Sequence, residues 1–238
     1  MVLAGVVRYR GLLGAVCAAV GLAVGVGCGG VTDPLAGQSG NQVLEAAIGN
    51  LKSASSFTMA GSLREPGGAY VVDLGYKTGT GCTGTVNQVG KGGLALVVIG
   101  KTAWVKPDTE FWKATAGSRA ATAIRLLGGK YLKGSTSDGA AAGLAKLCDV
   151  TSLASQLLTS SDVVRGQVTT VNGTSAVPLV DHAKSKTLYA TDTNTPQVLQ
   201  LDNSKTGSAG KITFSVGAPV TLTPPPPSHV VEGAKYGF

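Results

Sequence analysis

The chain has 238 residues, of which only 14% are charged and 5% are aromatic, while glycine alone accounts for 35. Its formal net charge is +7, but the lysines and arginines are scattered rather than clustered. Nucleic-acid binding generally uses a clustered basic face, so this pattern argues against a nucleic-acid partner. The length suffices for a single domain with a substantial core.

The N-terminal segment has the anatomy of a secretory signal. Arg8 and Arg10 precede an apolar stretch over residues 12–24, and the small residues 25–27 come directly before Cys28. A basic region, a short apolar region and a small-residue cleavage site are the three parts of such a signal. A transmembrane helix is the alternative, but the stretch is rich in glycine and shorter than the roughly 20 apolar residues that a span needs.

A cysteine directly after the cleavage site resembles a bacterial lipobox, in which the thiol is acylated and anchors the protein to a membrane. Gly25 departs from the leucine that usually stands three residues before that cysteine. We expect residues 1–27 to be a lipoprotein signal peptide and Cys28 to carry the lipid, at the extracytoplasmic face of the cell membrane. Residues 28–40 are then a flexible lipidated tether.

Two of the four cysteines remain to be explained after this assignment, because Cys17 lies inside the signal. Outside the cytoplasm, Cys82 and Cys148 are expected to form a disulfide. Free buried thiols and a metal site are the alternatives. The histidines, His182 and His229, are far apart in the sequence and show no ligand spacing, so we expect no metal and no cofactor.

The first half of the predicted domain is a helix followed by a run of strands. Ser39 and Gln42 fit the capping-box pattern, and apolar residues recur at helical spacing over residues 43–51. Alternation between glycine-rich turns then predicts an antiparallel meander. Its five strands are expected over residues 57–64, 70–77, 82–89, 94–99 and 102–106.

The second half is predicted to return from helices to strands. Helices are expected over residues 118–127, 138–147 and 151–158, and strands over residues 164–171, 177–181, 187–191, 198–201 and 211–216. Asn172-Gly173 is a strong hairpin signal. Four prolines, residues 224–227, cannot join a sheet and are expected to end the fold, so that 41–223 is the domain and 224–238 a Pro-rich C-terminal tail.

This order of elements predicts an α+β fold. So many strands should curl, giving a curved antiparallel sheet that forms an unclosed half-barrel with helices packed on its concave face. The lipobox, the tether, the single helix, the glycine-punctuated meander with residues 100–106, then Phe111-Trp112 and Asn172-Gly173 resemble the LppX/LprG family of actinobacterial lipoproteins, which has a LolA/LolB-like fold. The resemblance implies binding of an acylated lipid or glycolipid between sheet and helices, and its movement within the cell envelope.

The sequence offers little support for catalysis. Residues 95–102 formally resemble a phosphate-binding loop, but the segment before Gly100-Lys101 is Leu-Val-Val-Ile, which favours a strand and a hairpin turn. The Gly-x-Ser-x-Gly sequence of many hydrolases does not occur. His182 is interpreted as a surface residue of a predicted strand, and His229 follows the proline run. The resemblance supplies no catalytic residue either, and we predict that the protein is not an enzyme.

An apolar binding site is the remaining candidate. Trp104, Phe111 and Trp112 concentrate the aromatic surface, and Leu127 and Leu157 lie on predicted helices, although ordinary core packing explains each of them too. Two functions are compatible with this pattern: a carrier of an acylated lipid, or an envelope scaffold or sensor that binds a protein partner. A carrier predicts a large apolar pocket near the helices, and a scaffold predicts a filled interior with an exposed apolar patch outside it.

Overall fold

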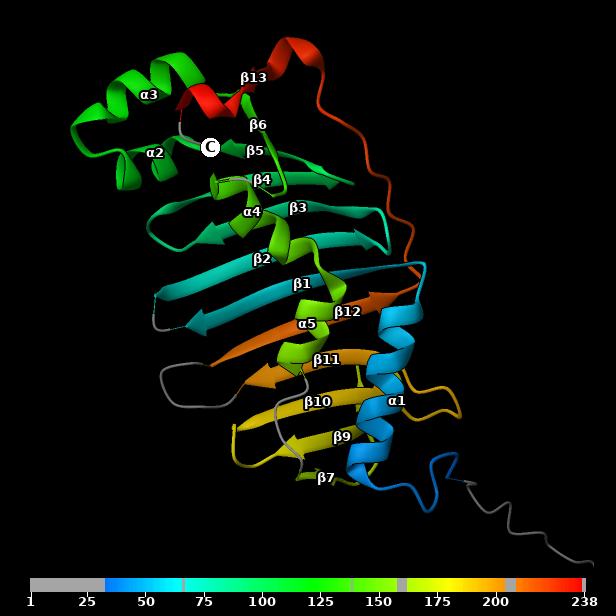
Figure 1. The fold of residues 1–238 in the computed structure, drawn as a ribbon. Coiled ribbons are helices and arrows are strands. Elements are labelled where there is room, and N and C mark those ends of the chain that lie inside the picture. The colour runs from blue at the N-terminus through cyan, green and yellow to red at the C-terminus, as the bar shows by residue number, and fades with distance from the viewer. Residues whose placement is uncertain (1–32, 66, 138, 158–161, 204–208, 237–238) are drawn as a thin grey trace, which may run out of the picture. The chain divides into compact units, whose positions relative to one another are not determined.

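A computed structural model of the chain describes residues 33–65, 67–137, 139–157, 162–203 and 209–236 (Figure 1). Residues 33–238 group into one compact unit. The expected signal peptide, Cys28 and the first part of the expected tether lie outside the described residues. Within those residues, no helix is both long enough and apolar enough to cross a membrane.

One mixed sheet dominates the described part of the chain. Its strands are β1 (Ser56–Glu65), β2 (Gly68–Lys77), β3 (Gly81–Gln88), β4 (Gly92–Ile99), β5 (Thr102–Pro107), β6 (Tyr131–Ser135), β7 (Val163–Arg165), β8 (Thr169–Val171), β9 (Thr174–Asp181), β10 (Lys186–Thr191), β11 (Val198–Asn203), β12 (Gly210–Val216) and β13 (Val230–Glu232). Their order across the sheet is β13-β6-β5-β4-β3-β2-β1-β12-β11-β10-β9-β7, with β8 paired to β9 alone. The order begins at β13 and ends at β7, so the sheet stays open, as expected for a half-barrel.

Short helices accompany the sheet. They are α1 (Gly40–Ser53), α2 (Thr109–Thr115), α3 (Ala120–Leu127), α4 (Gly139–Ala145) and α5 (Val150–Leu157), with the 3₁₀ turns η1 (Gly117–Arg119), η2 (Lys146–Cys148), η3 (Pro227–His229) and η4 (Gly233–Tyr236). Figure 1 shows α1, α4 and α5 lying across one face of the sheet, which we call the inner face. The opposite face is the back face. Helices α2 and α3 lie beside the β4–β6 end.

The core lies between the inner face and these helices. Alternate strand residues such as Phe57 and Met59 on β1, and Leu74 and Tyr76 on β2, point inward and are buried. Helix α1 contributes the apolar stripe that its sequence predicts, and the capping box is formed: the Ser39 hydroxyl accepts from the Gln42 amide at 3.3 Å, and the Gln42 side chain accepts from the Ser39 amide at 2.8 Å. The α1 residues in the core are Val43, Leu44, Ala47, Ile48 and Leu51.

Most of the predicted strands are confirmed, including the hairpins at Gly100-Lys101 and Asn172-Gly173. Asn172 and Gly173 both have positive φ angles, 49° and 81°, as a tight hairpin turn requires. The strand predicted over residues 164–171 is divided into β7 and β8. Two further elements, α2 and β6, were not predicted, because each is short and neither shows a clear periodicity.

The proline run does not end the fold, contrary to the sequence-based expectation. After it, β13 returns to the sheet and pairs in parallel with β6, Val230 lying opposite Tyr131, so the sheet is mixed rather than purely antiparallel. The prolines carry the chain there as an extended segment, which needs no ladder hydrogen bonds. Lys133 fixes the returning strand through an ion pair of 3.1 Å between its Nζ and Glu232 Oε1.

The tether is also shorter than expected. Leu35 is fully buried, and Asp33 accepts two hydrogen bonds from the guanidinium of Arg165, at 2.6 and 2.7 Å. Another guanidinium nitrogen of Arg165 donates to the Leu35 carbonyl at 2.8 Å. The hydrogen bonds from Arg165 to Asp33, and after them the Leu35 amide, which donates to Asp33 Oδ1 at 2.9 Å, hold the pKa of Asp33 below its ordinary value. The described end of the tether is therefore attached to the domain.

Gly84 of β3 provides a test of how closely the strands pack. Its φ is +147°, and an added Cβ would collide with the carbonyl of Asp73 on β2. We expect Gly84→Ala to lower the free energy of unfolding by about 3 kcal/mol, because both the backbone angle and the contact become strained. Gly49→Ala is the matched control. Gly49 lies in α1 with open space around it, so this substitution should raise the free energy of unfolding by about 1 kcal/mol. Urea unfolding measures the free energy of unfolding of both variants. Equal changes in the two variants would contradict the register of β2 and β3.

Candidate functional site

A cleft of about 460 Å³ opens where the helices of the inner face meet the ends of the strands. We call it the mouth cleft. Val98 of β4 reaches it from the inner face, and Ala145 and Val150 line it from α4 and α5. The other lining residues come from the end of α1, the β2–β3 and β4–β5 turns, the end of β6, and η2 with its flanks: Lys52, Lys77, Thr78, Gly79, Thr80, Gly81, Gly100, Thr136, Cys148, Asp149 and Thr151.

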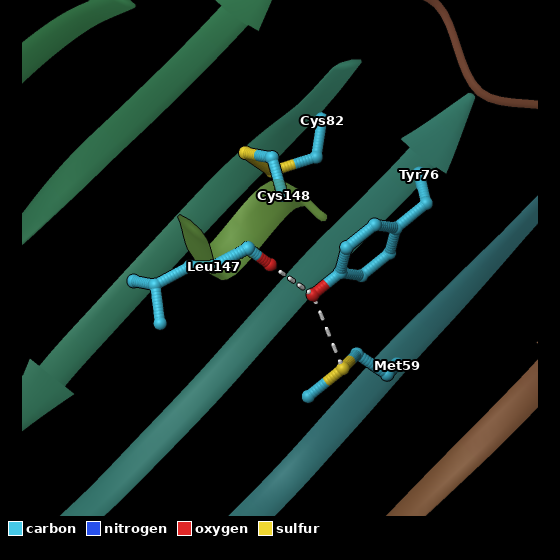
Figure 2. Close-up of a disulfide and its surroundings, with 5 residues drawn as sticks. All are labelled: Met59, Tyr76, Cys82, Leu147 and Cys148. Atoms are coloured by element: carbon cyan, nitrogen blue, oxygen red, sulfur yellow. Dashed lines mark hydrogen bonds between the residues drawn. A yellow bond between two sulfur atoms is a disulfide. The ribbon is translucent and has the colours of Figure 1, made fainter. Parts of the chain in front are cut away.

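A disulfide joins the two sides of this cleft (Figure 2). Cys82 on β3 and Cys148 in η2 are bonded, with 5.2 Å between their Cα atoms, as predicted from the sequence. The two residues are 66 positions apart in the chain. The bond therefore fixes the segment α4–η2–α5 over the inner face at its midpoint.

Tyr76, on β2 of the inner face, also holds the α4–η2–α5 segment on the sheet. Its hydroxyl donates to the carbonyl of Leu147, the residue before Cys148, at 2.9 Å, and lies 3.4 Å from the sulfur of Met59 (Figure 2). The ring stacks on Phe57 with the centroids 4.5 Å apart. Burial raises the pKa of Tyr76, so the hydroxyl stays protonated and remains a donor. The helical segment is thus bound to the sheet both covalently and by a partly buried hydrogen bond.

The rim of the mouth cleft is polar and mostly basic. Lys52 stands in the last turn of α1 and Lys77 ends β2, and both are exposed. Asp149 is the acidic residue of the lining, and its carboxylate accepts from the Ser152 hydroxyl at 2.6 Å and from the Thr151 amide at 3.0 Å. These hydrogen bonds, the Ser152 one above all, lower the pKa of Asp149. The carboxylate therefore stays ionised, and with the two ammonium groups it leaves the lining with a net charge of +1.

Behind the cleft, the space between sheet and helices is occupied by the chain's own side chains. Leu157, Ala141 and Ala154 of the α4–η2–α5 segment join one continuous apolar core with the inner face of the sheet. Leu144 and Leu153 are only partly buried and pack against its surface. The mouth cleft is therefore the surface end of an interior that is filled in this conformation.

The five apolar residues proposed from the sequence are not brought together. Trp104 points to the back face, because its neighbours Ala103 and Val105 are buried in the inner core. Phe111 and Trp112 lie on α2, in edge-to-face contact with ring centroids 6.0 Å apart. Leu127 is buried at the end of α3, outside the main core, whereas Leu157 belongs to that core.

None of those five residues lines the mouth cleft, and its rim was not predicted. Lys52 and Lys77 carry no sequence signal, because a lysine at the end of a helix or strand usually just points into water. Their nearness to the cleft depends on the position of α1 over the sheet. The cysteine pair was the one sequence feature that pointed to this region.

No protein-family model matches the chain, and no curated protein matches it in sequence. The chain is similar to a number of solved structures, among them the following three. LprF from Mycobacterium bovis has a TM-score of 0.54 and 17% identity, covering 78% of this chain and 96% of its own. The lipoprotein LppX from Mycobacterium tuberculosis has a TM-score of 0.49 and 14% identity, covering 76% and 96%. An uncharacterized conserved protein from Thermus thermophilus has a TM-score of 0.42 and 13% identity, covering 82% and 99%.

The described domain therefore has the fold of LprF, and the resemblance to the LppX/LprG family is confirmed at the level of the fold. Of the three structures, LprF is the one that superposes well enough to define that fold, over most of the length of both chains.

Removing the disulfide should loosen the helical segment before it affects the sheet. The chain-entropy relation gives about 4 kcal/mol for a loop of this length, so we expect Cys82→Ala/Cys148→Ala to lower the stability by that order. Hydrogen exchange should accelerate first in residues 139–157. Oxidised wild type is the reference, and reduced wild type should behave like the variant. Because part of this loss acts through the unfolded chain, exchange in the sheet should also rise, but less; an increase in residues 139–157 no larger than that in the sheet would show that the bond does not act locally.

Proposed function

We propose that the protein is a lipid-anchored envelope protein that binds the acyl chain of a lipid or glycolipid between the inner face and the α4–η2–α5 segment, and carries it within the envelope. The observation that carries the proposal is the position of the mouth cleft, whose lining includes Val98 of the core and Val150, which packs against the core. Its volume, about 460 Å³, lies within the range of roughly 300–1,000 Å³ that is usual for ligand sites.

The covering segment is suited to make room for an acyl chain. Helices α4 and α5 have seven and eight residues, and α4 consists of glycine, alanine and one leucine. Such short helices owe their stability to packing rather than to their own hydrogen bonds. Burying ten methylenes would contribute about 8 kcal/mol, enough to offset the displacement of side chains such as Leu153 from the core surface. The Cys82–Cys148 bond would keep the segment attached while its ends move.

The rim indicates which lipids fit. Lys52 and Lys77 favour a negatively charged headgroup, and the threonine hydroxyls around them offer further hydrogen bonds. A neutral lipid would gain the apolar contacts but not these charge-assisted ones. Nothing in this arrangement requires a reaction, so the proposed role is binding and transfer without catalysis.

A scaffold or sensor that binds a protein partner is the second candidate. Two observations favour it: the interior is filled by the chain's own side chains, and Leu147 of η2 is 41% exposed beside the cleft. In that case the mouth cleft and Leu147 would contact another envelope protein, and the core would never open.

Binding of a dansyl-labelled long-chain fatty acid to the soluble domain distinguishes the two functions. For a carrier we expect fluorescence enhancement that Ala145→Trp removes, because the indole fills the cleft. Ala140→Trp, at an exposed position on the same helix, is the matched control and should bind normally. Lipid-free protein from its native cells, together with binding that Ala145→Trp does not change, would favour the scaffold.

The rim lysines can be tested with the same probe and its methyl ester. Wild type should prefer the acid by about tenfold, the value of one charge-assisted hydrogen bond. Lys52→Gln/Lys77→Gln should remove this preference while the ester still binds. Lys91→Gln/Lys184→Gln, two exposed lysines outside the cleft, is the control and should keep it.

Lipidation at Cys28 requires its own experiment. We expect Cys28→Ala to leave an unprocessed precursor that carries no acyl group, because the thiol is the group to be acylated. Partition into a detergent phase after metabolic labelling with a fatty acid measures this directly, with Cys17→Ala as the control. Normal labelling of Cys28→Ala would reject the lipoprotein assignment.

A further inference from the structure

A second cleft, of about 290 Å³, lies on the back face over β10, β11 and β12. We call it the back-face cleft. Its base is formed by Tyr189, Gln200, Asp202 and Lys211. Tyr189 lies opposite Gln200, and Asp202 lies opposite Lys211, in the register of neighbouring strands. Cross-strand partners project from the same face of a sheet, so the four polar side chains form two adjacent rows.

These rows lie on the side away from the lipid site. Leu188, Leu201 and Ile212, the neighbours of the polar residues in sequence, belong to the inner core or pack against it. Because side chains alternate along a strand, the polar set faces the other way. The back-face cleft is therefore separated from the mouth cleft by the sheet itself, and a ligand bound there would be independent of the proposed lipid binding.

Gln200 is a buried polar residue, with only 4% of its surface exposed. Its amide nitrogen donates to Asp202 Oδ1 at 2.8 Å, so the carboxylate fixes the orientation of the carboxamide. Burial of an amide on a sheet surface costs free energy that an apolar residue would not. The hydrogen bond offsets part of that cost and leaves Asp202 with a second oxygen for another donor.

Tyr189 completes the base with a neutral hydroxyl. Burial, and secondarily the charge of Asp202, raise its pKa, so the phenol keeps its proton and can both donate and accept. One side of the cleft is closed by β8, which pairs with β9 alone, and by the hairpin turn that comes after it. Thr170 and Asn172 add a hydroxyl and an amide from there.

The chemistry of this set selects the ligand. One carboxylate and one ammonium balance each other, and the remaining groups are a phenol, amides and hydroxyls. Such a lining suits a neutral molecule with many hydroxyls, whereas an anion would meet the Asp202 carboxylate beside the ammonium, and an acyl chain would meet mainly polar groups. We propose that the back-face cleft is a saccharide-binding site, which takes a single neutral sugar ring of a glycan.

Saturation-transfer NMR tests this with the full-length protein in phosphocholine micelles, which contain no sugar. The probes are the methyl glycosides of glucose, galactose and mannose at millimolar concentration. We expect transfer to the ring protons of at least one glycoside, and an affinity that falls about tenfold in Tyr189→Phe and in Asp202→Asn, each of which loses one strong hydrogen bond. Asp73→Asn, an exposed aspartate on the back face of β2, is the matched control and should bind as wild type does.

The outcomes are separable. Thermal unfolding of each variant shows whether it is folded, and Tyr189→Phe retains the ring and hence the packing. Failure of all three glycosides to receive saturation would overturn the proposal, as would equal binding by Tyr189→Phe and wild type. Displacement of a bound glycoside by inorganic phosphate would overturn it too, because it would show an anion site instead. Loss of fatty-acid binding in Ala145→Trp has no bearing on any of these results.

Discussion

An open sheet with one apolar face must keep that face out of water, and the rest of this structure depends on how the covering is done. A closed barrel would bury its interior by its own curvature, but here the strand order runs from β13 to β7 without closing. Helix α1 covers β9–β11 with a regular apolar stripe and a complete capping box. The other half is covered by the short segment α4–η2–α5, whose residues are too small and too few to hold it there alone. The Cys82–Cys148 bond and the Tyr76–Leu147 hydrogen bond supply that attachment.

The two halves of the cover therefore differ in how they can move. Helix α1 would have to expose several fully buried side chains to leave the sheet, which costs roughly 1.5–3 kcal/mol for each large one. The α4–η2–α5 segment contributes mainly alanines and partly buried leucines. Opening of the interior is thus easiest along α4 and α5, on either side of the point where η2 is attached to the sheet.

Much of the fold could be predicted from the sequence, because the signals involved are local. The capping box of α1, the alternation in β1–β5 and the Asn172-Gly173 turn each depend on neighbouring residues. The disulfide was predicted from the expected compartment and the number of cysteines. The return of the chain as β13 could not be predicted, since three residues beyond a proline run carry no periodicity, and their partner β6 lies almost 100 residues earlier.

The site was harder to predict, because it depends on which elements lie next to each other. The orientation of Trp104 follows from its alternation with Ala103 and Val105, but only once the inner face is known. The rows Tyr189–Gln200 and Asp202–Lys211 depend on the registers of three strands and on a bulge in β11, where Leu199 is the extra residue. Polar residues in a strand otherwise indicate only a solvent-facing side. Cross-strand register, rather than composition, decides where the candidate binding groups gather.

The strand β13 also has a consequence for how copies of the protein coexist. An exposed sheet edge offers unpaired backbone groups to other chains, and long flat edges promote association between sheets. Both ends of this sheet's strand order are three-residue strands, β13 and β7. Strand β13 covers part of β6, which has five residues, and the ion pair between Lys133 and Glu232 places charged side chains at that edge. Neighbouring copies of the domain would thus meet short edges, one of them charged, which disfavours strand-to-strand polymerisation while the mouth cleft and the back face stay accessible.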